Sequence, residues 1–94
     1  MQTAEIRRNV LRVLLEVFAG QGMDETSAAH IDLTEDLGMD SIQFITLVVE
    51  LEARFEITVP DERLHPEHFQ NADRITATIR EIRSQHNDSG GRAQ

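Results

Sequence analysis

A serine that could carry a covalent group lies in the turn Asp36-Leu37-Gly38-Met39-Asp40-Ser41-Ile42, where a long apolar helix is predicted to begin. The first turn of a helix has unpaired backbone N–H groups and the positive end of the helix dipole. Ser41 is therefore well placed to bear a phosphate ester. Serine is also a preferred N-cap residue, and from these seven residues alone a plain helix cap is the simpler interpretation.

The negative charge of the chain is concentrated around this serine. The net charge is −8, and residues 24–62 contain eleven acidic side chains against a single arginine, Arg54. Nucleic acids require a basic footprint, so this distribution argues against them as partners. It favours proteins that present a basic surface. The alternative is ordinary solubility charge, which would not need such concentration in one segment.

The bulk properties indicate one small domain. The 94 residues contain no cysteine, which excludes a disulfide framework and a thiolate metal site. No apolar run approaches the length of a membrane span, and the N-terminal residues do not resemble a secretory signal. We therefore expect a cytoplasmic protein, and we expect it to be a monomer.

The elements that must position Ser41 are helices. Apolar residues at helical spacing predict a helix from Thr3 to about Ala19, a second over Ser41 to Phe55, and a last one from Asn71 or Asp73 to about Arg83. A short helical turn is expected near residues 66–69. Residues 20–40 are predicted to form a long loop. The expected fold is all-α, a small three- to four-helix bundle over residues 1–83, followed by a disordered polar tail at 84–94.

The helix over residues 41–55 has two apolar ridges. Phe44, Leu47, Val48, Leu51 and Phe55 share one arc and are predicted to face the core. Ile42, Ile45, Val49 and Ala53 cluster on the opposite side. So small a domain rarely buries both sides of one helix.

The second ridge has two interpretations. The long loop could cover part of it, and for Ile45 coverage by the loop and exposure to solvent are equally supported. Otherwise the ridge stays accessible as a docking patch beside Ser41, because apolar residues rimmed by charge are typical of a transient interface. The predicted partner-binding set is Ile42, Ile45, Val49, Glu50, Glu52 and Ala53.

Taken together, these residues resemble the acyl carrier protein family, which includes peptidyl and aminoacyl carriers. The resemblance rests on the turn 36–42, the apolar run 44–51, and the segment 52–62 with its Val-Pro-Asp-Glu sequence. Phe69, Ala72, Ile75 and Ile79 fit the apolar positions of the family's last helix. The similarity extends over roughly residues 6–82. It favours Ser41 as the bearer of a phosphate ester over Ser41 as a plain helix cap.

The resemblance implies a specific chemistry. Ser41 would be the attachment point of 4′-phosphopantetheine, delivered from coenzyme A by a phosphopantetheinyl transferase that uses a divalent metal. Asp40 would face that transferase or its metal. The prosthetic thiol, rather than any side chain of this protein, would then hold an acyl or aminoacyl group as a thioester. Further partners would be the loading and processing enzymes, with basic docking surfaces.

One departure from the family bears on the pathway. Fatty-acid carriers that resemble this chain usually have acidic residues two and five positions after the serine, where this chain has Gln43 and Thr46. The departure favours a stand-alone carrier in a polyketide, nonribosomal peptide or aminoacyl pathway, including D-alanyl transfer. A fatty-acid carrier remains an alternative.

The sequence does not support an enzyme or a metal-binding protein. A Gly-x-Ser-x-Gly elbow is absent, and a pair of histidines, His65 and His68, is too few for a metal site, so neither an enzyme nor a metal protein is predicted. When Asp24 or Asp32 is taken as the first position of a calcium-binding loop, no glycine stands at the sixth position, so that pattern fails. The main alternative to a carrier is an unmodified acidic helical adaptor with a carrier-like fold, in which Ser41 has no special role.

Overall fold

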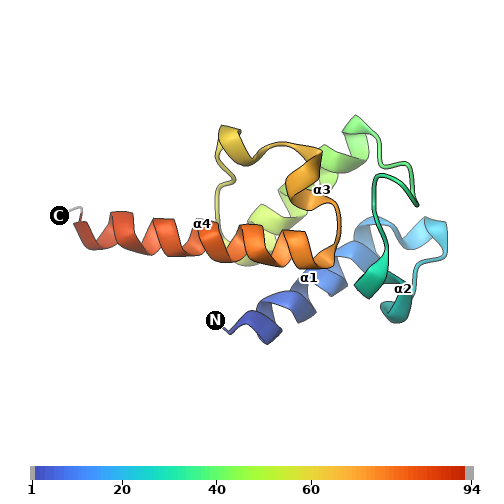
Figure 1. Ribbon diagram of the computed structural model, residues 1–94, viewed down its shortest axis with the longest axis horizontal. Helices are drawn as coiled ribbons and strands as arrows, with labels where there is room; N and C mark the ends of the chain where they lie inside the picture. The colour runs from blue at the N-terminus through green and yellow to red at the C-terminus, as the bar shows by residue number, and fades with distance from the viewer. Residues whose placement is uncertain (1, 93–94) are drawn as a thin grey trace.

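The computed structural model describes the backbone of residues 2–92 and the side chains of residues 2–85. Within these residues the protein is all-helical, as predicted, and no strand occurs. The elements in chain order are α1 (Thr3–Val17), η1 (Ala19–Gln21), α2 (Glu25–His30), α3 (Ser41–Phe55), η2 (Asp61–Arg63), η3 (Pro66–Phe69) and α4 (Ala72–Arg92). Figure 1 shows α4 as the longest helix, extending past the rest of the bundle toward the C-terminus.

Helix α1 is the centre of the bundle, because it contacts α2, α3 and α4. Its buried side chains recur every three or four residues, which places them on one face. They join a single apolar core with residues of the other helices and of η3. The fully buried larger side chains of this core are Phe18, Phe69, Leu14, Leu33, Leu47, Leu51, Ile75, Ile79, Val10 and Val13.

Helix α3 has the predicted bounds, Ser41–Phe55, and buries the predicted arc. Leu47, Val48, Leu51 and Phe55 lie in the core. Phe44 is only partly buried, and its ring meets that of Phe69 edge-on, with the centroids 5.5 Å apart. The arc therefore fixes α3 against the core and leaves the other side of the helix outward.

The prediction of one uninterrupted loop over residues 20–40 was wrong, because residues Glu25–His30 form the helix α2. The side chain of Asp24 accepts a hydrogen bond from the Ser27 N–H at 2.8 Å and caps this helix. Ala28 is its only fully buried residue, so α2 lacks the apolar stripe by which longer helices are recognised.

Helix α4 begins as predicted but continues further. The Arg74 N–H donates to the Asn71 side-chain oxygen at 2.8 Å, which identifies Asn71 as the cap. The helix ends at Arg92 rather than near Arg83, since neither proline nor any other strong helix breaker follows Arg83 directly. The division into a carrier domain that ends at residue 83 and a disordered tail stays a prediction, and residues 93–94 with the side chains of 86–94 lie outside the described part.

Within the described residues, none of the helices combines the length and the apolar character that crossing a membrane requires.

Candidate functional site

Ser41 is the first residue of α3, and Asp40 rather than Ser41 is its N-cap. The Gln43 N–H donates to Asp40 Oδ1 at 2.8 Å, and the Asp40 N–H donates to Gln43 Oε1 at 3.2 Å. This reciprocal pair is a capping box. The interpretation of Ser41 as a plain cap is therefore wrong, because the preceding residue performs that role.

The Ser41 side chain is exposed and, among the described residues, its hydroxyl makes no hydrogen bond. The first N–H groups of a helix have no carbonyl partner within the helix. Asp40 accepts from Gln43 through its side chain and from Phe44 through its carbonyl, at 2.9 Å. Among the described residues the N–H groups of Ser41 and Ile42 form no hydrogen bond, and with the helix dipole they would favour an anion bonded to Ser41.

The turn before Ser41 has a defined conformation. Gly38 adopts a φ of 64°, in the left-handed region where side chains are disfavoured. The Gly38 N–H donates to the Thr34 carbonyl at 3.0 Å, and the Met39 N–H donates to the Leu33 carbonyl at 3.0 Å. Leu37 and Met39 pack against the core. These hydrogen bonds and core contacts fix the backbone before and after Gly38, and so the path of the chain into Ser41.

The same loop is fastened to the start of α4. The Leu33 N–H donates to the Gln70 carbonyl at 2.8 Å, and Gln70 Nε2 donates to Asp32 Oδ2 at 2.6 Å. The Glu35 N–H also donates to Asp32, at 2.7 Å. These bonds to Asp32, first that from Glu35 and then that from Gln70, lower the pKa of its carboxyl group. A residue 29 positions after Ser41 therefore helps to set where Ser41 lies.

The outer ridge of α3 is open to solvent. The exposed fractions are 76% for Ile42, 60% for Ile45 and 53% for Val49, and Ala53 is exposed as well. The loop does not cover Ile45, so the ridge is accessible to solvent, while its use as a docking patch stays a prediction. Three large apolar side chains exposed along one helix beside Ser41 form a surface suited to a partner.

The two glutamates of the predicted patch differ in what they contact. Glu50 is exposed, whereas Glu52 is half-buried and its Oε2 accepts a hydrogen bond from the Val59 N–H at 2.9 Å. Glu52 thereby holds the connector after α3. A neighbouring polar residue, Arg54, forms a salt bridge with Glu16 of α1 at 3.2 Å. Glu50 is therefore the acid of the patch that is free to meet a partner.

The two positions that depart from fatty-acid carriers have local structural roles. Gln43 closes the capping box, and the Thr46 hydroxyl donates to the Ile42 carbonyl at 2.9 Å. The role of Gln43 could have been found from the sequence, because a cap residue followed three positions later by Gln is a capping-box pattern.

The histidine pair does not form part of a larger cluster. The rings of His65 and His68 are 6.2 Å apart at their centroids. In the part of the chain that the structure describes, no three histidine or acidic side chains are grouped as metal ligands are.

Comparison with known proteins gives one family match, to the family described as "Phosphopantetheine attachment site", over residues 11–81. An acyl carrier protein from Kocuria rhizophila is 39% identical over 57 residues, 58% of this chain and 70% of the relative. A D-alanyl carrier protein from Streptococcus suis is 31% identical over 79 residues, 83% and 95% of the two chains. The aminoacyl carrier protein 1 of Bradyrhizobium diazoefficiens is 25% identical over 80 residues, 80% and 82%.

Proposed function

Because the chain belongs to the carrier proteins that bear a phosphopantetheine attachment site, we propose that Ser41 is the residue to which the group is attached. The family membership confirms the resemblance inferred from the turn 36–42 and the residues that follow it. The cofactor of the family is 4′-phosphopantetheine, as predicted. When attached, this group supplies a thiol at the end of a flexible arm, on which an acyl or aminoacyl group is carried as a thioester.

The observation that carries the proposal is the exposure of Ser41 together with the capping of α3 by Asp40. An attachment serine must present its oxygen to a separate enzyme, and afterwards its phosphodiester needs a favourable electrostatic setting. Ser41 meets the first need because its hydroxyl has no bond to give up within the described residues. It meets the second because it lies at the N-terminus of the 15-residue helix α3.

Asp40 is proposed to assist a phosphopantetheinyl transferase from the side of the carrier. One oxygen of its carboxylate, Oδ1, is used by the cap, while the side chain as a whole remains exposed. The charge is therefore available to the transferase or to a metal ion in its site. Carrier proteins are generally non-catalytic, and here the protein supplies the position of the oxygen and the surface that enzymes recognise.

The outer ridge of α3 is proposed to receive those enzymes. Ile42, Ile45, Val49 and Ala53 would make the apolar contact, with Glu50 and, to a lesser extent, the half-buried Glu52 opposite basic side chains. Because the first turns of α3 have Gln43 and Thr46 in place of acids, the apolar contact should contribute more to this docking than charge does.

For the pathway, we favour a stand-alone carrier in polyketide, nonribosomal peptide or aminoacyl biosynthesis, in the cytoplasm and as a monomer. Support comes from the low acidity of the first turns of α3. It also comes from the similarity to proteins named as D-alanyl and aminoacyl carriers. A fatty-acid carrier is the alternative, supported by the similarity to a protein named acyl carrier protein.

The test is intact-mass analysis after incubation with coenzyme A and a broad-specificity phosphopantetheinyl transferase. We expect the wild-type protein to gain the mass of one phosphopantetheinyl group and Ser41→Ala to gain none. Ser84→Ala is the matched control, since Ser84 is an exposed serine of α4 and should leave loading unchanged. An unmodified wild-type protein, under conditions that load another carrier, would favour the unmodified adaptor.

A further inference from the structure

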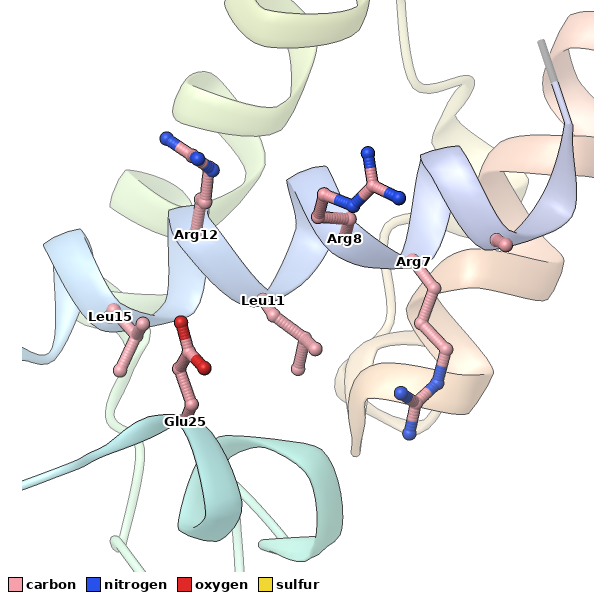
Figure 2. A pocket seen from close by; sticks show the side chains of 7 residues that line it. Arg7, Arg8, Leu11, Arg12, Leu15 and Glu25 are labelled. Carbon is pink, nitrogen blue, oxygen red and sulfur yellow. The ribbon is translucent and has the colours of Figure 1, made fainter.

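A groove of about 440 Å³ lies between α1 and α2 and includes no residue of α3. Leu11 and Leu15 point from α1 toward α2, and Glu25 points from α2 toward α1 (Figure 2). Both leucines are half-buried and pack against the core, so they form an apolar floor. The complete lining is Ala4, Arg7, Arg8, Leu11, Arg12, Leu15 and Glu25.

The rim of this groove is basic, although the protein has a net charge of −8. Arg7 is already paired, because its Nε lies 3.0 Å from Asp73 Oδ1. Arg8 and Arg12 are exposed and, among the described residues, form no salt bridge. Figure 2 shows that they leave α1 on the side opposite to Glu25, so Glu25 does not neutralise them. Two arginine charges therefore remain for a ligand.

The spacing of these residues fits a helix. The pairs Arg8–Arg12 and Leu11–Leu15 are each separated by one helical turn, a rise of about 6 Å. A partner helix with acidic residues and apolar residues, each spaced i, i+4, would match both pairs at once. Two exposed arginines are a smaller basic footprint than nucleic acid or an anionic membrane requires, so neither is the expected occupant. At physiological ionic strength charges beyond about 8 Å are screened, so the local rim governs a closely docked segment.

We propose that the groove between α1 and α2 is a second docking site, which binds an acidic amphipathic helical segment of a partner protein. The charge of the groove's basic rim is opposite to that of the acidic segment around Ser41. The two surfaces would therefore select different partners. A carrier with two such sites could be held by one protein while another acts at Ser41.

The experiment uses the full-length protein and a stapled helical peptide with glutamates and leucines each spaced i, i+4. Binding is followed by amide chemical shifts and by fluorescence anisotropy. We expect the largest shifts at Arg8, Leu11 and Leu15. Arg12→Glu should weaken binding roughly tenfold, and Arg12→Gln by less, because a close charge pair is lost.

The matched control is Arg80→Glu, which makes the same change in net charge on an exposed residue of α4. It should change the affinity by less than about twofold. Ser41→Ala should bind like the wild type, since the groove is independent of the attachment site.

Four outcomes would overturn the proposal. The first is equal binding of a peptide with lysines in place of the glutamates. The second is an equal effect of Arg12→Glu and Arg80→Glu. The third is peptide-induced shifts centred on α3. The fourth is a different occupant, seen either as tighter binding to anionic lipid vesicles or as self-association that Arg12→Glu abolishes.

Discussion

Asp40 is the cap of α3 and is proposed to present its charge to the transferase, and two substitutions separate these roles. Asp40→Ala removes the acceptor that lies 2.8 Å from the Gln43 nitrogen. Loss of an N-cap side chain costs about 0.5–2 kcal/mol. For a domain of this size, a loss of about 1 kcal/mol lowers the melting temperature by about 4–8 °C.

Asp40→Asn keeps an oxygen acceptor in the same place. Asparagine is as good an N-cap as aspartate, so only the charge–dipole interaction is lost, at a cost of about 0.3–1 kcal/mol. The asparagine variant should therefore stay closer to the wild type in stability than Asp40→Ala. If the transferase uses the carboxylate, this same variant should be loaded much more slowly than the wild type.

Both quantities can be measured on the same samples, stability by urea denaturation and loading by the rate of mass gain with a transferase. Wild-type stability of Asp40→Ala would refute the capping argument. Wild-type loading of Asp40→Asn would refute the role of the charge and leave Asp40 as a cap alone.

Three further predictions concern the framework of the site. Leu51→Ala should lower the free energy of unfolding by about 2–5 kcal/mol, while Val49→Ala should change it by less than about 0.5 kcal/mol. The reason is that Leu51 is fully buried and Val49 is 53% exposed. Equal losses in urea denaturation would contradict the assignment of Leu51 to the core and Val49 to the surface. Gly38→Ala should cost about 1–2 kcal/mol, since φ at this position is 64°, whereas Gly20→Ala, with open space around the added methyl group, should be close to neutral by the same measurement. Asp32 has a lowered pKa in the folded protein, so its contribution to stability is present above about pH 4 and is lost as the pH falls through the lowered value. When the free energy of unfolding is measured against falling pH, it should decline less steeply for Asp32→Asn than for the wild type. An unchanged profile would show that the Asp32 carboxylate does not contribute to the loss of stability in acid.

The helix that carries Ser41 could be predicted from the sequence because its signals are strong and agree. Residues 44, 47, 48, 51 and 55 define an apolar arc over 15 residues, and no other element competes for them. The exposure of Ile42 and Val49 followed from the same geometry, since residues opposite a buried arc face solvent. Whether Ile45 is covered could not be decided, because that depends on the path of a loop.

The features that were missed depend on single residues or on tertiary contacts. Helix α2 has six residues and one buried alanine, so it has no periodicity to detect, although Asp24 and Glu25 are typical of a helix start. The plain-cap interpretation of Ser41 was off by one position, because Asp40 is the cap, and the Gln43 three residues after Asp40 was the available signal. The bond between Asp32 and Gln70 joins distant parts of the chain, and local sequence carries no sign of it.

That contact has a consequence for engineering carriers with altered partners. A chimaera that exchanges α3 alone would separate the helix from the loop that positions its first residue, Ser41. A chimaera that stops before Gln70 would leave that loop without the hydrogen bonds to Gln70. The smallest segment that contains α3, the loop before it and the Gln70 partner of that loop therefore runs from residue 32 to residue 70. Recombination borders placed inside this segment should shift the position of Ser41.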